Sequence, residues 1–147
     1  MSSLKVYVAG CWRDREDLKR VMDEVKARGH RITHDWTTFE ASYMDRHERN
    51  KLCARKDIEG VVTSDVLLVL LTRPDYAYRG TSSEAGAAMA CRHLRSGGGP
   101  RIWVVTDKDP RMTPEAELPY SLTTCFMHDA DQYFSTVEAA LDALGKL

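Results

Sequence analysis

Short apolar segments alternate with amphipathic segments along the 147-residue chain. Segments rich in valine, isoleucine and leucine that end at glycine or polar residues predict strands. Residues 66–71 are apolar at every position, which is typical of a central parallel strand covered by helices on both faces. The five predicted strands are residues 4–9, 31–34, 66–71, 101–106 and a short 123–127.

Four intervening segments have apolar residues at helical spacing. The first carries Leu18, Val21, Met22 and Val25 on one face and ends at Gly29, a common helix stop. The others are predicted over residues 46–63, over residues 81–95, and after a capping box formed by Ser135 and Glu138. Small residues dominate the helix at 81–95, so we expect it to lie close against the sheet.

Alternating strands and helices predict an α/β fold with a parallel sheet and right-handed connections. The economical arrangement is a single domain over residues 1–147 with a doubly wound, flavodoxin-like (Rossmann-like) sheet of five strands. Ligands of such sheets bind beyond the carboxyl ends of the strands, where the strand order reverses. This rule selects three loops: residues 10–15, 72–84, and 106 onward.

Composition narrows the class of protein. Apolar residues make up 43% of the chain and charged residues 29%, with a net charge of -1, which is typical of a globular protein without a basic face. We therefore expect neither a nucleic-acid polymer nor a membrane as partner, and the absence of a signal-like start favours a cytoplasmic location. The four cysteines and five histidines show no ligand spacing, so we expect no metal, no cofactor and no disulfide.

The loop at residues 10–15 lacks the usual phosphate-loop patterns. Gly10 would still let a ligand approach the backbone, and Arg13 lies near a helix start, where an anion can bind. A plain strand-to-helix turn with solvated arginines explains the same residues equally well, and both interpretations stay open.

Glu84 is the most informative residue of the second loop, and two interpretations of it are open. With Thr81 it has the spacing of a capping box, in which it would only bind a backbone amide. Alternatively it is a carboxylate nucleophile, because a glutamate in the first helical turn is expected to have a low pKa.

Asp57 lies on the second predicted helix, close in register to buried positions. A solvated acid is the default interpretation; the alternative is a general acid opposed to Glu84, since cleavage of sugar bonds typically uses two carboxyl groups. Trp12, Trp36 and Tyr78 fall at strand ends or in loops, where a base would stack on one of them.

Three motifs, in this order, carry a resemblance to a known family. They are Tyr7-Val8-Ala9-Gly10, then Asp57 shortly before Ser64-Asp65-Val66-Leu67-Leu68-Val69, then Gly80-x-x-x-Glu84-x-Gly86-x-Ala88. Together they resemble the nucleoside 2-deoxyribosyltransferases and the related 2'-deoxynucleoside 5'-phosphate N-hydrolases, over roughly residues 5–103. The segment that begins Gly10-Cys11-Trp12-Arg13 is particularly similar to the hydrolases.

The resemblance implies a role for each matching residue. Glu84 would attack the anomeric carbon and form a covalent deoxyribosyl-enzyme, and Asp57 would assist departure and capture of the base. Tyr7 would hold the nucleophile, and Arg13 would contact a 5'-phosphate. A transferase would resolve the intermediate with a second free nucleobase and a hydrolase with water, and a homodimer or higher homo-oligomer is implied.

The sequence departs from the family at several positions. Cys11 replaces a serine of the hydrolases, Ala85 replaces a leucine, and Tyr78 replaces a sugar-binding aspartate of the transferases, for which Asp75 is a candidate substitute. The residues predicted to bind a nucleoside or nucleotide are Gly10, Cys11, Trp12, Arg13, Trp36, Asp75, Tyr78, Gly80 and Ser82.

Two further functions stay open at this point. Gly80-Thr81-x-x-Glu84 also fits a motif of phosphoribohydrolases of the cytokinin-activating type, although the preceding glycines of that motif are missing. A non-catalytic nucleotide-binding or sensing module is the third candidate, and Tyr78 is the residue that favours it.

Overall fold

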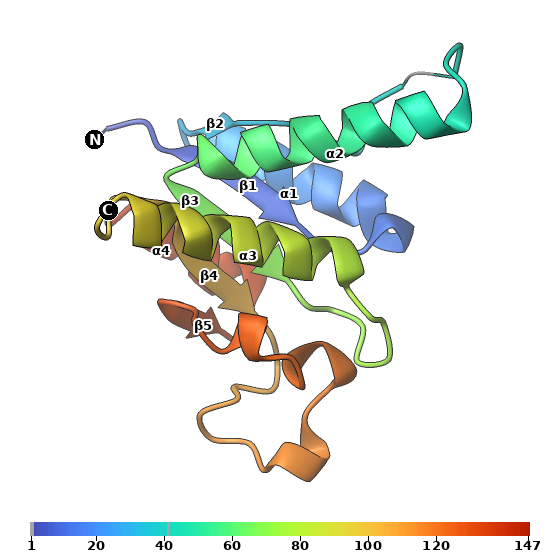
Figure 1. Ribbon diagram of the computed structural model, residues 1–147. Coiled ribbons are helices and arrows are strands. Elements are labelled where there is room, and N and C mark those ends of the chain that lie inside the picture. The colour runs from blue at the N-terminus through green and yellow to red at the C-terminus, as the bar shows by residue number, and fades with distance from the viewer. Residues whose placement is uncertain (1, 41) are drawn as a thin grey trace.

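The computed structural model describes residues 2–40 and 42–147, which form a five-stranded parallel sheet (Figure 1). The strand order is β2-β1-β3-β4-β5. The strands are β1 (Lys5–Ala9), β2 (Arg31–Ile32), β3 (Val66–Leu70), β4 (Arg101–Val105) and β5 (Gln132–Phe134). The flavodoxin-like α/β fold predicted from the sequence is confirmed.

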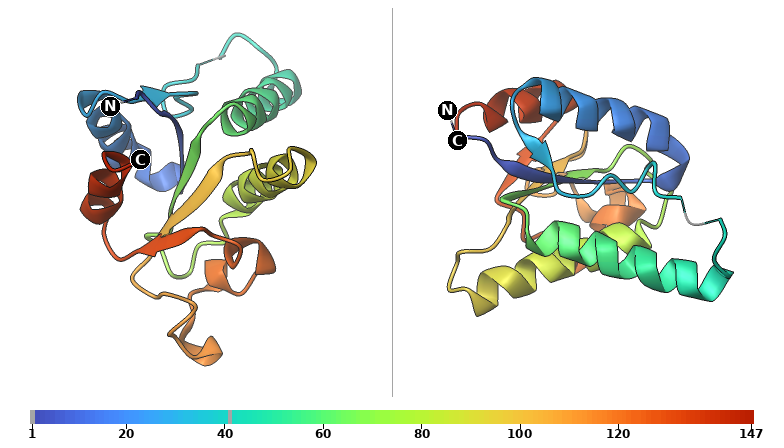
Figure 2. Two further views of the ribbon diagram at one scale, coloured as in Figure 1. Left: turned by 90° about the vertical axis from the view of Figure 1, so that its left-hand side faces the viewer. Right: turned by 90° about the horizontal axis from the view of Figure 1, so that it is seen from above.

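Helices cover both faces of this sheet (Figure 2). The helices α1 (Arg15–Ala27) and α4 (Val137–Leu144) lie on one face, and α2 (Arg46–Val62) and α3 (Arg79–Leu94) lie on the other. The chain winds from β1 to β2 in one direction and from β3 to β5 in the other, so the strand order reverses between β1 and β3. None of the helices in the described residues is long and apolar enough to span a lipid bilayer.

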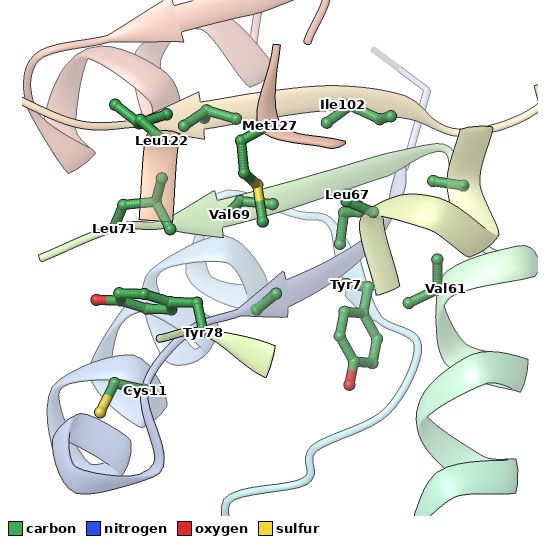
Figure 3. Close-up of a cluster of buried hydrophobic side chains, with 14 residues drawn as sticks. Tyr7, Cys11, Val61, Leu67, Val69, Leu71, Tyr78, Ile102, Leu122 and Met127 are labelled. Atoms are coloured by element: carbon green, nitrogen blue, oxygen red, sulfur yellow. The ribbon is translucent and has the colours of Figure 1, made fainter. Parts of the chain in front are cut away.

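Alternate side chains of the strands supply two apolar clusters. Val6, Val8 and Leu68 point toward α1 and α4, whereas Leu67 and Val69 point toward α2 and α3 (Figure 3). The second cluster also contains Ala85 and Ala88, whose small side chains allow α3 to approach the sheet closely. The predicted contact between the small residues of this helix and the sheet is confirmed.

The prediction of the fifth strand at residues 123–127 is wrong. Cys125–Met127 form a short 3-10 helix (η4) instead, and β5 follows at Gln132–Phe134, where it pairs with β4. Met127 is fully buried in the cluster under α3, so its burial, rather than strand pairing, accounts for the apolar character of this segment. At the actual strand, the Phe134 ring packs against Trp103 with ring centroids 5.1 Å apart.

Two other boundaries differ from the prediction. The second strand is two residues long instead of four, although the Thr33 amide still donates to the Val6 carbonyl at 3.0 Å. The last helix is capped by Thr136, whose hydroxyl accepts a hydrogen bond from the Ala139 amide at 3.2 Å, and not by Ser135. A threonine one position later therefore supplies the same type of cap.

Candidate active site

Tyr7 lies at the floor of the site, in the middle of β1 on the face covered by α2 and α3. Tyr7 is 1% exposed, and Figure 3 shows its hydroxyl pointing out of the apolar cluster. Gly60 of α2 makes room for the ring. A Cβ atom built at Gly60 would lie 2.8 Å from Cδ2 of Tyr7 and 2.9 Å from Cβ of His34. Only a glycine therefore lets α2 pack at this depth.

Glu84 belongs to the second turn of α3. The helix begins at Arg79, and Tyr78 at its N-cap makes no side-chain capping bond, so the capping-box interpretation of Thr81 and Glu84 is wrong. Thr81 is instead buried inside the helix. The Oε2 atom of Glu84 is inaccessible to solvent and has no hydrogen-bond partner among the described residues.

Asp57 projects from α2 one helical turn before Gly60. Its Oδ1 atom lies 3.4 Å from Nε2 of His34, which follows β2, and neither atom makes a hydrogen bond within the described residues. Both side chains are mostly buried, at 32% and 17% exposure. Asp57 is therefore a half-buried acid facing a histidine, and the default interpretation as a solvated acid is wrong.

These groups perturb one another's protonation. Burial, followed by repulsion from Asp57, raises the pKa of Glu84 to about 8, although the neighbouring Tyr7 hydroxyl opposes the rise. Burial also raises the pKa of Asp57, against the effect of His34 and Tyr7. Burial and the two neighbouring carboxyl groups raise the pKa of Tyr7. The predicted low pKa of Glu84 is wrong, because its carboxyl group is buried in the second turn and not exposed to free amides at the helix start.

The three side chains line one cavity of about 560 Å³ at the carboxyl ends of β1 and β3. This is the edge of the sheet at which the strand order reverses. Of the predicted binding residues, the cavity is lined by Gly10, Trp12, Arg13, Trp36, Asp75, Tyr78 and Gly80. Cys11 is buried in the core and Ser82 lies on another side of α3, so neither contributes to the lining.

Two tryptophans separate this cavity from a neighbouring one of about 670 Å³. Trp12 and Trp36 have ring centroids 6.0 Å apart and, together with Asp57, line both cavities. Trp36 is held by a hydrogen bond from Nε1 to the Val8 carbonyl at 2.7 Å, whereas Trp12 is 52% exposed. Trp12 is thus the more exposed of the two, and the Arg15 guanidinium lies over its ring, 4.9 Å from the centroid.

Gly10 and Arg13 occupy the first loop as predicted, but for partly different reasons. A Cβ atom at Gly10 would lie 2.7 Å from Cδ2 of Leu18 on α1, so packing against this side chain also favours a glycine there. Arg13 lies in a 3-10 turn at Trp12–Asp14, and it forms no ion pair with any residue in the described ranges. It is a free cation at the cavity mouth.

Sequence analysis missed six residues of the site, namely His34, Gly60, Tyr76, Ala77, Arg79 and Thr81. A glycine inside a predicted helix indicates that another part of the chain packs closely against the helix there, so Gly60 could have been identified from the sequence. The signal for His34 is absent from local sequence, because its partner Asp57 is 23 positions away and meets it only in the folded chain. No cluster of metal-ligating side chains occurs in the part of the chain that the structure describes.

Comparison with known proteins places the fold. No model of a protein family matches this chain, and no curated protein matches it by sequence. The chain is similar to the crystal structure of a conserved protein from Enterococcus faecalis V583, with a TM-score of 0.62 and 19% identity over 99% of each chain. It is also similar to a 2-deoxyribosyltransferase from Bacillus psychrosaccharolyticus, with a TM-score of 0.57 and 16% identity over 94% of this chain and 90% of that chain. At these identities the similarity establishes a shared fold.

Proposed function

We propose that the protein cleaves or exchanges the N-glycosidic bond of a 2'-deoxynucleoside or its 5'-monophosphate through a covalent glycosyl-Glu84 intermediate. The observation that carries this proposal is the meeting of Glu84, Asp57 and Tyr7 in one cavity, with Oε2 of Glu84 buried and unpartnered. A buried carboxyl oxygen without a partner is costly, and a reacting sugar would supply the missing contact. The shared fold with a 2-deoxyribosyltransferase supports the proposal.

In the first step the ionised carboxylate of Glu84 attacks the anomeric carbon of the sugar. The carbon–nitrogen bond breaks, its electron pair goes to the base, and the carboxylic acid of Asp57 gives the base a proton. The active form therefore has Glu84 ionised and Asp57 protonated. The Tyr7 hydroxyl lowers the pKa of both carboxyl groups, so it helps to ionise Glu84, whereas burial is what favours the protonated form of Asp57.

In the second step water or a second base attacks the same carbon and releases Glu84. The ionised Asp57 then accepts the proton of the attacking group, which restores the starting protonation of the site. Water makes the enzyme a hydrolase and a base makes it a transferase. Neither step requires a cofactor or a metal ion.

The cavity walls suggest how the substrate is oriented. The base would lie toward Trp12 and Asp57, where a second cavity provides room, and the sugar would lie against Glu84 and Gly80. A built Cβ at Gly80 would be 3.8 Å from Oε1 of Glu84, so the glycine keeps the space before the carboxyl group open. Arg13 and Arg79 are both cavity-lining cations, and Arg13 is the one that the family resemblance assigns to a 5'-phosphate.

Product analysis tests the reaction directly. The protein is incubated with deoxynucleosides and deoxynucleoside 5'-monophosphates, with and without a second base, and the products are separated by chromatography. Free base alone indicates a hydrolase, and a new nucleoside indicates a transferase. Release of base only from ribonucleoside 5'-monophosphates would favour the phosphoribohydrolase, and binding without any product would favour the non-catalytic module. Either of these last two outcomes contradicts the proposal.

Replacing Glu84 by glutamine tests the nucleophile. The amide has nearly the same shape but cannot form the glycosyl ester, so we expect kcat to fall by about 1,000-fold or more while the fold is retained. Glu59→Gln is the matched control, because Glu59 is an exposed glutamate on α2. Wild-type turnover in Glu84→Gln would eliminate Glu84 as the nucleophile.

A further inference from the structure

Tyr78 has an unusual backbone conformation immediately before α3. Its φ and ψ angles are 49° and 43°, in the left-handed region that bulky residues rarely adopt. Such a conformation costs on the order of 1–2 kcal/mol and persists only where surrounding contacts enforce it. The contacts of Tyr78 therefore indicate what the conformation achieves.

The side chain of Tyr78 fixes the loop that precedes it. Its hydroxyl oxygen accepts hydrogen bonds from the amides of Thr72 at 2.9 Å and Arg73 at 3.0 Å. The residue is 1% exposed, and its ring packs edge-on against Tyr76 with centroids 4.8 Å apart. Figure 3 shows the hydroxyl directed away from Tyr7, so it serves the loop and not the reacting groups.

Asp14 anchors the same two loop residues from the other side. Its carboxylate accepts hydrogen bonds from Nε and Nη2 of Arg73 at 2.9 and 2.7 Å, and from the Thr72 hydroxyl at 3.1 Å. The start of the loop is thus held through its backbone by Tyr78 and through its side chains by Asp14. Between these anchors and α3, Asp75 and Tyr76 form part of the cavity wall.

Tyr78 also determines where α3 begins. Its carbonyl accepts the first hydrogen bond of the helix, from the Ser82 amide at 2.9 Å. Glu84 follows six residues after Tyr78 along the chain. Because each residue of a helix turns the side chain by about 100°, the starting point of α3 decides which direction the Glu84 carboxyl group faces.

We propose that Tyr78 is a positioning residue of the active site, whose hydroxyl fixes the loop at residues 72–78 and thereby orients Glu84 and the cavity wall. The assignment to catalysis rests on the function proposed above. The tyrosine stands where transferases resembling this chain have a sugar-binding aspartate, so the proposal gives that departure a physical role. Tyr78 lines the cavity, but its hydroxyl is bound to the loop amides, so it acts on Glu84 through the loop and α3.

Tyr78→Phe removes only the hydroxyl oxygen and leaves two amides without their acceptor. We expect amide hydrogen exchange at Thr72 and Arg73 to become at least about tenfold faster, because the loop opens locally more often. We also expect kcat to fall by about 10- to 100-fold with a smaller change in KM, since misplacement of a reacting group affects the transition state most. A second variant, Tyr78→Asn, also removes the hydroxyl acceptor, and asparagine adopts the left-handed backbone conformation more readily than phenylalanine. The same measurements are made on this variant if Tyr78→Phe does not fold.

Tyr133→Phe is the matched control. The hydroxyl of Tyr133 donates to the Met127 carbonyl at 2.8 Å, in a part of the chain that does not line the cavity. Loss of either hydroxyl removes buried hydrogen bonding, but only Tyr78→Phe should change kcat. If the two substitutions changed kcat equally, Tyr78 would contribute only to stability, and the proposal would be overturned.

A titration of Glu84 separates this proposal from the proposed reaction. The pKa of Glu84, followed by carboxyl NMR, should move from about 8 toward its ordinary value in Tyr78→Phe, because the carboxyl group leaves its buried position. If the wild type forms no product but this shift occurs, the reaction is wrong and the positioning role stands. Wild-type exchange rates and an unchanged Glu84 titration in Tyr78→Phe would refute the positioning role.

Discussion

Gly60→Ala is the sharpest single test of how the site is assembled. The added Cβ would lie 2.8 Å from Cδ2 and 2.9 Å from Cε2 of Tyr7, and 2.9 Å from Cβ of His34. Carbon atoms in contact are normally about 3.5–4.0 Å apart, so these groups must separate by about 1 Å. Neither neighbour is the free end of a flexible chain, because Tyr7 is fully buried in β1 and the Cβ of His34 is fixed to its backbone.

The expected effect on stability has two opposing parts. Overpacking costs typically about 1–3 kcal/mol, whereas replacing a glycine inside a helix by alanine gains about 1 kcal/mol. Gly86→Ala on α3 is the matched control, because a Cβ there meets nothing within 4 Å and only the helical gain applies. The difference in unfolding free energy between the two alanine variants therefore gives the overpacking cost directly, and we expect about 1–3 kcal/mol.

The expected effect on turnover is larger than that on stability. A displacement of about 1 Å between α2 and β1 separates Asp57 and Tyr7 from their places opposite Glu84, and such misplacement costs about 100-fold in rate. Denaturant unfolding and initial rates at saturating substrate, measured on Gly60→Ala and Gly86→Ala, provide both numbers. If Gly60→Ala were as stable and as active as Gly86→Ala, close packing at Gly60 would not position the site.

Four further measurements test the site and its assembly. The value of kcat/KM should follow a bell-shaped pH profile, rising as Glu84 ionises near its pKa of about 8 and falling as Asp57 loses the proton that it must donate; a flat profile would contradict this pair of protonation states. Folding raises the pKa of Glu84, so the free energy of unfolding should decrease as pH rises from the pKa of Glu84 in the unfolded chain to its folded value of about 8. Denaturant titrations of Glu84→Gln should not show this decrease. Arg13→Ala should weaken binding of a 5'-monophosphate by about 1.5–3 kcal/mol and leave the nucleoside unaffected, as calorimetry would show; equal wild-type affinities for both ligands would exclude a phosphate site at Arg13. Light scattering at micromolar concentration should find a homo-oligomer, as the family resemblance implies, and a fully active monomer would contradict this expectation.

The sequence predicted those elements whose burial is uniform. The segment at β3 is apolar at every position because helices cover both of its faces, and its boundaries were predicted to within one residue. The strand β5 was not predicted from the sequence, because it lies at the edge of the sheet, is three residues long and is only partly buried. The more apolar segment before it was chosen instead, since pattern alone cannot separate burial in a 3-10 turn from burial in a strand.

The residues of the candidate site were predictable from the sequence, whereas their electrostatics were not. Glu84, Asp57 and Tyr7 were identified as candidates from motif spacing, and the order of the strands brings them to one cavity. Their electrostatics were not accessible from spacing, because the pKa of Glu84 depends on burial between α2 and α3. The helix start at Arg79 was equally hidden, since it depends on the contacts of Tyr78 across its loop.

The position of that helix start bears on the choice between candidate functions. A phosphoribohydrolase motif needs a glycine-rich turn whose backbone amides surround a phosphate, because only glycine leaves room for such an approach. Here the turn before α3 is Ala77-Tyr78-Arg79, which has no glycine, and the ring of Tyr78 is buried. The same segment instead directs Glu84 at a cavity that Asp57 and Tyr7 also line. Residues 78–84 therefore fit a carboxylate facing a sugar better than a glycine-rich cradle for a phosphate, and an anion would have to rely on the side chains of Arg13 and Arg79, which both line the cavity.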